Sequence, residues 1–403
     1  MDAHNSQRRH DIDWLRILAV LLLFFFHTAR IFDTDDFYVK NTAVSEGFTV
    51  FINFIYLWHM PLFFFLSGVG TWFALRSRGG RGYASERFKR LFIPLLFGAC
   101  FIVPPQVYYM RLSGQTYNHP PLDVFEDSYL QFFPTFFNGI APSGNWEWGH
   151  LWFLAYLFTF SLVALPLFRS IEKTYGRGLV EKLASVAEKR GGIFLFGLPL
   201  MAGEALLRAN WPGMQNLYND WSNFLFFILF FIYGYLLCSD ERFWQAVERD
   251  GKLALLLAAA IFSIYPLRLA LGHLPSRGYN PDYMSLMALR GLDAWLWVVA
   301  VLSFGRRYLG FTNRILTYAN EAALPVYILH QTVIVMVGYY VVRWQTGMMS
   351  GYFIITMLSL VVTLLACDLL VRRINVVRFL FGMRAKRSRA HILAFDKARP
   401  ENP

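Results

Sequence analysis

The chain has 403 residues, of which 56% are hydrophobic and only 16% are charged. Soluble domains carry about 25% charged residues, so this composition and its repeated apolar runs exclude an ordinary soluble fold and predict a polytopic helical membrane protein. The formal charge is +11. In a membrane protein a basic balance is first explained by Lys and Arg in cytoplasmic loops, so we expect no nucleic-acid partner.

About ten apolar stretches are long enough to cross a membrane, which takes roughly 20 helical residues. The sequence therefore predicts an all-α integral membrane protein with about ten transmembrane helices in a single bundle over residues 14–371. A polar N-terminus over residues 1–13 precedes the bundle, and a basic tail over residues 372–403 follows it. The predicted spans are 14–32, 48–75, 91–110, 149–168, 192–209, 221–238, 252–272, 285–304, 319–342 and 351–371.

The distribution of basic residues predicts the orientation of these spans. With ten spans, 29 of the 38 Lys and Arg residues lie on the side that holds both termini, against eight on the opposite side. Because Lys and Arg are enriched in cytoplasmic loops, both termini are predicted to be cytoplasmic. The tail either lies along the inner membrane surface or serves only to set this orientation.

Two ionisable residues, Arg16 and His27, lie inside the first span. Eleven residues at about 100° each make about three turns, so both side chains lie on one helix face, roughly 16 Å apart along the axis. Ionisable groups in a membrane-length segment are costly and are therefore functional candidates. In the alternative interpretation His27 is hydrogen-bonded within the bundle, and Arg16 snorkels to the interface or pairs with Asp13.

The second span contributes His59 and Ser67, two polar groups at membrane depth. Each alone is either a satisfied interior group or part of a substrate path. After this span, Arg87 and Arg90 stand ahead of Pro94. These two arginines are either a topology anchor or a cytoplasmic site for phosphate groups.

Later spans add a second set of polar candidates. His150, preceded by Glu147, begins the fourth span at its outer end, within reach of the outer end of the first span. In the ninth span His330 lies nine residues after Glu321, so the two face opposite ways on a straight helix. Asp368 is expected to pair with Arg372, four residues later.

No motif indicates a metal or a nucleotide-binding loop. The three cysteines, Cys100, Cys238 and Cys367, have no pairing or metal-ligand spacing and are interpreted as small buried residues. The chain has no P-loop, no G-x-S-x-G elbow and no H-E-x-x-H helix. We therefore predict no metal site.

Five segments follow one another along the chain and carry a family resemblance. They are the pair Arg16 and His27, the segment Phe63-Phe64-Phe65-Leu66-Ser67-Gly68, the pair Arg87 and Arg90 ahead of Pro94, the segment His150-Leu151-Trp152-Phe153-Leu154, and the segment Tyr327-Ile328-Leu329-His330. Together they resemble the acyltransferase-3 family of bacterial membrane proteins, and within it the glucan biosynthesis protein C group. The likeness runs from about Asp11 to Arg372.

The resemblance implies an enzyme, a ten-span acyltransferase of the bacterial cytoplasmic (inner) membrane. Such an enzyme takes an acyl group, acetyl or succinyl, from cytoplasmic acyl-CoA and delivers it to a hydroxyl of an extracytoplasmic glycan or related acceptor. Acyl-CoA is then a co-substrate, and the acceptor glycan and the membrane lipids are the other partners.

The resemblance also implies roles for the donor side. A thioester donor with several phosphate charges suits a basic cytoplasmic mouth, for which Arg16, Arg87 and Arg90 are the candidates. His27, toward the outer side, is the candidate base that takes the proton of the acceptor hydroxyl as it attacks the thioester.

The remaining candidates belong to the acceptor side and to the acyl channel. His150 or Glu147 would orient the base or meet the acceptor. His59, Ser67 and His330 would line the channel.

A transporter or flippase for a lipid-linked or anionic substrate is the main alternative, because buried charges at mid-membrane are common in transporters. Transporters often contain internal repeats, and no convincing repeat is present here. A sensory or scaffolding protein is a third reading, which the shortage of soluble sequence disfavours.

Overall fold

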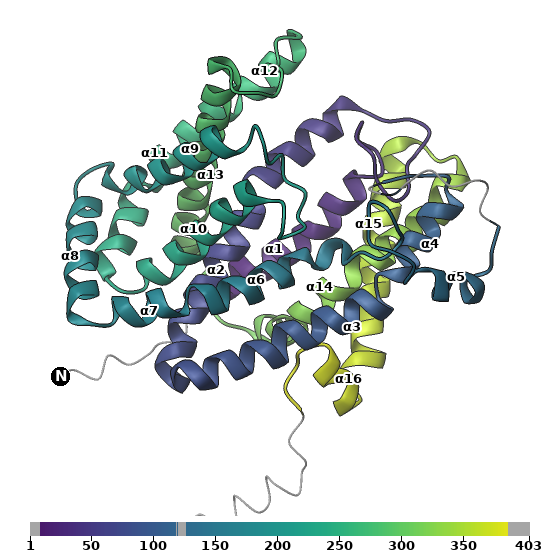
Figure 1. Ribbon diagram of the computed structural model, residues 1–403, viewed down its shortest axis with the longest axis horizontal. Helices are drawn as coiled ribbons and strands as arrows, with labels where there is room; N and C mark the ends of the chain where they lie inside the picture. Colours follow the sequence, from purple (N-terminus) through teal and green to yellow (C-terminus); the bar gives the residue numbers. More distant parts are fainter. Residues whose placement is uncertain (1–8, 118, 120–125, 386–403) are drawn as a thin grey trace, which may run out of the picture.

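The computed structural model describes residues 9–117, 119 and 126–385 (Figure 1). Residues 1–8 of the predicted N-terminus and residues 386–403 of the predicted basic tail lie outside this part. Every regular element in it is helical and none is a strand, which confirms the predicted all-α class. The α-helices are α1 His10–Ala29, α2 Glu46–Arg87, α3 Ile93–Phe101, α4 Pro104–Leu112, α5 Tyr129–Thr135, α6 Trp152–Val163, α7 Leu165–Ile171, α8 Thr174–Glu188, α9 Leu198–Leu207, α10 Trp221–Leu237, α11 Glu241–Phe262, α12 Ile264–Ala270, α13 Pro281–Tyr308, α14 Arg314–Val341, α15 Met348–Ala366 and α16 Asn375–Leu380.

Five short helical segments of other types connect or extend these helices. The π-helix η1 joins α2 to α3, and the π-helix η5 extends α15. The 3-10 segments precede α6, precede α9 and follow α14. Their bounds are η1 Phe88–Phe92, η2 Gly149–Leu151, η3 Gly192–Gly197, η4 Val342–Trp344 and η5 Cys367–Val371.

Six helical stretches of the described residues are long and apolar enough to cross a membrane, or seven if α6 and α7, which meet at 47°, form one bent span. The second and third predicted spans lie within one of these stretches, Glu46–Leu112. The fifth and sixth predicted spans fall in two shorter apolar helical stretches, Gly192–Leu207 and Trp221–Leu237. Length and composition thus bear out six or seven spans, and not the predicted ten.

The long helix α2 turns back on itself at Gly79. This residue has φ 67°, in the left-handed region that glycine enters without a steric penalty. Beyond the turn, the Tyr83 and Thr71 hydroxyls lie 3.0 Å apart in a hydrogen bond, which holds the returning segment against the first part of the helix. The turn carries Arg87 and Arg90 back alongside α2.

Helix α1 lies at the centre of the molecule (Figure 1). Helices α7 to α11 and α13 lie on one side of it, and α3, α14 and α15 on the other. Trp14 near the start of α1 donates to the carbonyl of Phe311 at 3.0 Å, just ahead of α14, whereas His27 near the end of α1 contacts His330 in the second half of α14. The two helices therefore run parallel.

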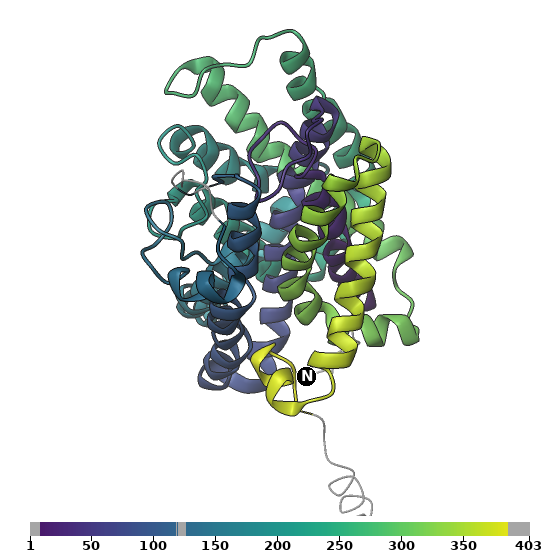
Figure 2. The same ribbon diagram turned by 90° about the vertical axis from the view of Figure 1, so that its right-hand side faces the viewer.

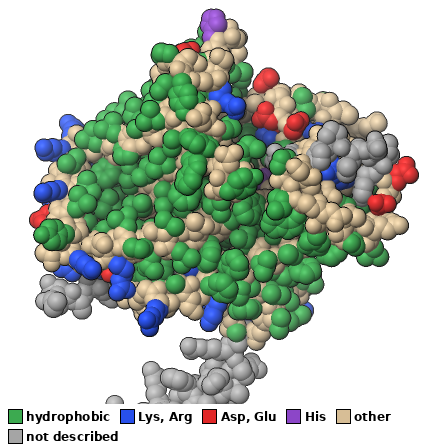
Figure 3. Space-filling view, in the orientation of Figure 1, with side chains coloured by type: hydrophobic (Ala, Val, Ile, Leu, Met, Phe, Trp, Pro, Cys, Tyr) green, Lys and Arg blue, Asp and Glu red, His purple; other side chains and the backbone are tan. Residues whose placement is uncertain are grey.

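The surface agrees with burial in lipid. On the face in Figure 3, hydrophobic side chains form a broad field with Lys and Arg side chains along its lower and left margins. Leu253, Leu256 and Leu257 of α11 are among the exposed apolar residues. In Figure 2, α15 runs nearly top to bottom and α16 lies at its lower end.

Candidate active site

Three histidines from distant parts of the chain meet in the interior. His330 of α14 is fully buried, and its ring centroid lies 5.0 Å from that of His27 of α1 and 5.0 Å from that of His150 of η2. Tyr327, one turn before His330, lies 5.7 Å from both the His150 and the His330 rings. The structure thus brings three of the predicted site residues together, and we call His27, His150 and His330 the histidine cluster.

Hydrogen bonds determine which nitrogen of His330 carries the proton. Nδ1 lies 2.5 Å from the carbonyl oxygen of Tyr327, which can only accept, so Nδ1 is the donor. Nε2 of the neutral ring then holds the lone pair, and it is buried with no hydrogen-bond partner among the described residues. His330 therefore presents an unused basic nitrogen inside the bundle.

His150, in contrast, uses both ring nitrogens. Nε2 donates to the carbonyl oxygen of Ile328 at 3.0 Å, and Nδ1 accepts from the side-chain amide of Gln106 at 3.3 Å. Its own carbonyl oxygen accepts from the Tyr327 hydroxyl at 2.5 Å. These bonds hold His150 neutral and in one orientation, as a group that positions its neighbours.

A buried amide network supports His150. Gln106 of α4 donates to Thr332 at 2.7 Å, and its carbonyl oxygen accepts from Gln331 at 2.9 Å. Thr332 in turn donates to the carbonyl oxygen of Ile102 at 2.7 Å. The network ties α4 to α14 at the level of the histidine cluster.

His27 is partly buried, and its Nδ1 has no hydrogen-bond partner among the described residues. The buried ring of Phe37 stacks over it, with centroids 6.2 Å apart and planes at 22°. Phe37 belongs to the loop between α1 and α2, so this loop covers the base candidate.

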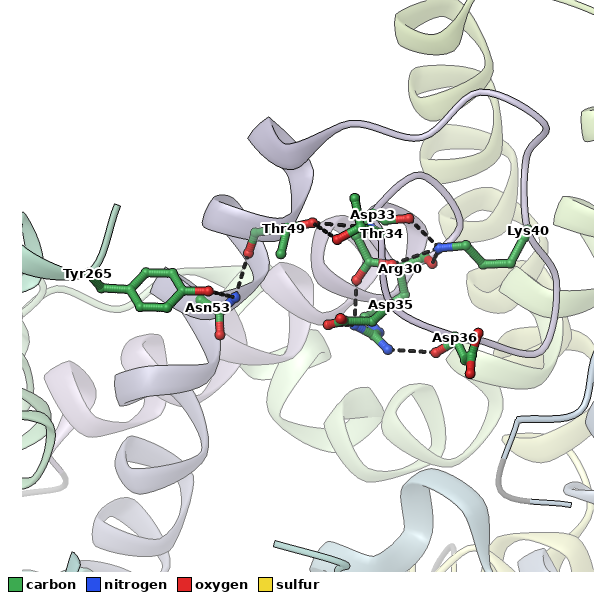
Figure 4. A network of polar contacts seen from close by, with 9 residues as sticks. All are labelled: Arg30, Asp33, Thr34, Asp35, Asp36, Lys40, Thr49, Asn53 and Tyr265. Carbon is green, nitrogen blue, oxygen red and sulfur yellow. Dashed lines mark hydrogen bonds and ion pairs between the residues drawn. The ribbon is translucent and has the colours of Figure 1, made fainter. Parts of the chain in front are cut away.

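A polar network holds that loop in place (Figure 4). Fully buried Asp33 accepts from Arg30 and, at 2.7 Å, from the Lys40 ammonium. Lys40 also donates to the carbonyl oxygens of Arg30 and Asp33 at 2.9 and 2.6 Å. Burial raises the pKa of Asp33 and lowers the pKa of Lys40, so desolvation opposes both charges and the network depends on its hydrogen bonds.

Glu147 lies next to this loop, on the segment that leads into η2. Its carboxylate accepts from the hydroxyl of buried Tyr38, and the other carboxylate oxygen is 3.5 Å from Nε2 of His119. Tyr38 packs edge-on against Phe37, with ring centroids 5.3 Å apart. Through Tyr38, Glu147 is thus linked to Phe37, the residue that covers His27.

Arg16 lies at the other end of α1 and pairs with Asp13 at 3.3 Å, one of the two alternatives that the sequence left open beside a functional role. Its side chain is 38% exposed and lines a cavity of about 270 Å³ between α1 and α2, together with Arg9, Gly70 and Phe73. Arg16 therefore remains accessible although it has an acidic partner.

Arg87 and Arg90 lie away from that cavity. Arg90 donates to the carbonyl oxygen of Gly382 at 3.1 Å, pairs with Glu86 at 3.4 Å, and lines a cleft of about 600 Å³. Arg78, Lys89 and Arg384 also line this cleft, which we call the basic cleft. The guanidinium of Arg87 stacks over the Tyr83 ring at 4.7 Å.

His59 and Ser67 are satisfied interior groups. Nε2 of buried His59 donates to the carbonyl oxygen of Ala19 at 2.8 Å, and Ser67 donates to the carbonyl oxygen of Phe63 in its own helix at 2.8 Å. Neither bond involves the histidine cluster. The structure gives both residues a role in packing α2.

Two further predictions, the outward direction of Glu321 and the pairing of Asp368 with Arg372, are confirmed near the start of α14 and in η5. Glu321 faces away from His330 and pairs with Arg372 and Arg378 at 2.7 and 2.8 Å. Asp368 pairs with Arg372 at 2.7 Å. Within the described residues, no group of three or more His, Cys, Asp or Glu side chains could hold a metal ion.

Sequence reasoning missed Gln106, Phe37 and the Lys40 network. Tyr327 was quoted only as part of a motif, although its place one turn before His330 puts both on neighbouring faces of α14. Gln106 carries no local signal, because its partners come from two other segments, η2 and α14, up to 226 residues away.

Comparisons with known proteins agree with one another. The family model described as "Acyltransferase domain" matches residues 9–372. The glucans biosynthesis protein C of Salmonella schwarzengrund and that of Salmonella typhi are each 25% identical over 391 residues, covering 95% of this chain and 96% of the relative. That of Shigella dysenteriae serotype 1 is 26% identical over 397 residues, covering 94% and 95%.

No solved structure matches the chain significantly. The family match spans most of the chain, including the three histidines of the cluster and Arg16, Arg87 and Arg90. With its apolar helices, this match shows that the chain belongs to the acyltransferase-3 family and is a multi-pass membrane enzyme that transfers acyl groups.

Proposed function

We propose that this enzyme moves an acetyl or succinyl group from cytoplasmic acyl-CoA to a hydroxyl of an extracytoplasmic glycan. The observation that carries the proposal is the contact between partly buried His27 and fully buried His330, whose rings each have an unpartnered nitrogen among the described residues. The name shared by the similar proteins, glucans biosynthesis protein C, favours a glucan as the acceptor. Family membership favours this activity over transport.

The proposed chemistry needs one base. The acceptor hydroxyl attacks the thioester carbonyl while His27 takes its proton. The tetrahedral intermediate collapses, the carbon–sulfur bond breaks, and the departing thiolate of CoA takes the proton back from His27. The unpartnered Nε2 of His330, one ring away, would accept a hydrogen bond from the transient imidazolium.

The donor enters, in this proposal, at the basic end of the molecule. Arg16 lines one cavity there and Arg90 lines the basic cleft, so each guanidinium is placed to meet phosphate groups. Arg87 contributes charge beside them. His59 and Ser67 contribute to the donor's path only indirectly, because they pack α2, which forms a wall of it.

The acceptor approaches from the opposite end of α1. Glu147 and Tyr38 stand beside Phe37, which covers His27, so a sugar hydroxyl reaching the base would pass these groups. His150 keeps His330 in place and does not itself take a proton.

We also retain the ten-span topology, with both termini cytoplasmic, in the bacterial inner membrane. The bundle covers residues 14–371 between the N-terminus 1–13 and the tail 372–403. Three features support it: the turn at Gly79, which divides the Glu46–Leu112 stretch into two crossings, the bent pair α6 and α7, and the two shorter apolar stretches.

The first test measures turnover of acetyl-CoA and succinyl-CoA by the full chain in lipid nanodiscs, with a linear β-glucan oligosaccharide as acceptor. His27→Ala should lower kcat by about 10²- to 10⁴-fold, the usual contribution of a general base. Arg16→Ala should raise KM for the donor and change kcat little.

His273→Ala is the matched control, because His273 is exposed and far along the chain from the cluster. It should behave like the wild type. Turnover that survives in His27→Ala would rule out His27 as the base. If the wild type transfers an acyl group from neither donor, acyl-CoA is ruled out as the donor class.

A further inference from the structure

Asn320 of α14 has a buried and unused side-chain amide. Neither Nδ2 nor Oδ1 has a hydrogen-bond partner among the described residues. Its polar neighbours are engaged elsewhere, since Tyr318 donates to Asp368 at 2.9 Å and Glu321 accepts from Arg372 at 2.7 Å. Buried polar groups are nearly always paired, so an amide with both groups unused indicates a missing partner.

Asn320 lies on the side of α14 that faces α1. It precedes Gly338 by eighteen residues, which is about five full turns at 100° per residue, so both point the same way. A side chain at Gly338 would meet Ile31, just beyond the end of α1. His330, which contacts His27 of α1, lies about 80° around the same helix.

Asn320 also lies at the depth of Arg16. The two helices run parallel, and the rings of His27 and His330 are side by side. Toward the helix starts, Arg16 is eleven residues before His27 and Asn320 is ten residues before His330. At about 1.5 Å per residue these separations are roughly 16 and 15 Å.

We infer that Asn320 binds the arm of the acyl donor that joins the thioester to the phosphates. This inference rests on the proposed function. In CoA this arm carries, on the phosphate side, a hydroxyl and an amide, which offer the donor and acceptor groups that Asn320 needs. An extended chain of about thirteen bonds separates sulfur from phosphate, roughly 15 Å at the rise of an extended backbone.

The length of the arm matches the separation between the histidine cluster and the depth that Arg16 and Asn320 share. With the thioester at the histidine cluster, the phosphate end of the arm reaches this depth, where the phosphates meet Arg16 and the hydroxyl and amide next to them come within reach of the Asn320 side chain. His27 is then needed for every thioester donor. Asn320 contributes to binding only when the donor has the complete arm, and Arg16 only when it has phosphates.

Three acetyl donors separate these contacts: acetyl-CoA, S-acetyl-pantetheine, which lacks the phosphates, and S-acetyl-N-acetylcysteamine, which also lacks the arm's hydroxyl and inner amide. For Asn320→Ala we expect kcat/KM to fall about tenfold with the first two donors, through KM, and to stay at the wild-type value with the third. Arg16→Ala should affect acetyl-CoA alone, and His27→Ala all three.

Thr317→Ala, an exposed position one turn earlier on α14, is the matched control and should equal the wild type. Asn320→Gln, which keeps the amide, should recover part of the loss. Equal losses of Asn320→Ala with all three donors, a loss in kcat alone, or no loss with acetyl-CoA would overturn the inference.

If the wild type does not use S-acetyl-N-acetylcysteamine, the kinetics of Asn320→Ala with acetyl-CoA decide instead. A higher KM supports the inference, and a loss in kcat alone overturns it. If the wild type uses no donor at all, the proposed function fails with the inference. If the wild type turns over acetyl-CoA and Asn320→Ala does so equally well, the proposed function stands and only the proposed role of Asn320 is rejected.

Discussion

Hydrogen bonds, rather than burial, distinguish the residues of the histidine cluster. All three rings lie in the interior, but His150 has a partner for each nitrogen, whereas His330 has one for Nδ1 alone. A ring whose second nitrogen already accepts a hydrogen bond loses that bond when it is protonated, while a ring with a free nitrogen does not. The partners therefore separate a positioning histidine from two that can handle a proton.

Gln106→Leu tests this distinction. The change removes the donor to Nδ1 of His150 and leaves Gln331 without its acceptor. We expect the free energy of unfolding to fall by about 1–3 kcal/mol, the cost of buried groups left unpaired, and kcat to fall while KM for the donor holds. Thermal unfolding in detergent and steady-state kinetics measure these effects.

Gln245→Leu makes the same change at an exposed position of α11 and should alter neither quantity. A Gln106→Leu enzyme with wild-type kcat and unfolding temperature would show that the amide network does not support the site.

At the scale of elements, two parallel helices and one loop build the site. Helices α1 and α14 set its depth, and the loop between α1 and α2 places Phe37 over His27. The loop has no regular structure, so Lys40 supplies the bonds that a helix would supply from its own backbone.

Lys40→Met keeps the aliphatic stem and removes the ammonium. Three acceptors on Arg30 and Asp33 then lose their donor, so we expect a loss of about 2 kcal/mol in stability and a lower kcat, because Phe37 is no longer held over the base. The midpoint of thermal unfolding and the rate of acyl transfer measure the two effects. The matched variant Lys182→Met, on exposed α8, should leave both unchanged, and an equal loss in the two variants would contradict the role of the network.

At the scale of the whole molecule, the number of crossings depends on short elements. The loop between α9 and α10 is extracytoplasmic if the Gly192–Leu207 and Trp221–Leu237 stretches both cross the membrane, and cytoplasmic if neither does. Tyr218 in this loop is 71% exposed, and Tyr175, at the start of α8 on the predicted inner side, is 97% exposed.

Cysteine labelling in intact cells distinguishes the two topologies. In a background with Cys100, Cys238 and Cys367 replaced by serine, Tyr218→Cys should react with a membrane-impermeant maleimide, and Tyr175→Cys should react only after permeabilisation. Protection of both positions in intact cells would rule out ten spans.

Much of the fold and part of the site could be predicted from local pattern. The helical class, the ion pairs of Arg16 with Asp13 and of Asp368 with Arg372, and the turning away of Glu321 are set by helix periodicity, which acts over a few residues. The break in α2 at Gly79 and the short lengths of α9 and α10 have no such signal. They depend on packing against other helices.

The sequence by itself determined the membrane class, the family and the common face of Arg16 and His27, because apolar length, motif order and helical spacing are properties of the chain alone. Only the tertiary structure decided that His330 contacts His27, that Gln106 donates a hydrogen bond to Nδ1 of His150, and that Arg16 and Arg90 line separate cavities. Those contacts join segments up to about 300 residues apart, and their geometry depends on how parallel helices pack, which no local spacing encodes.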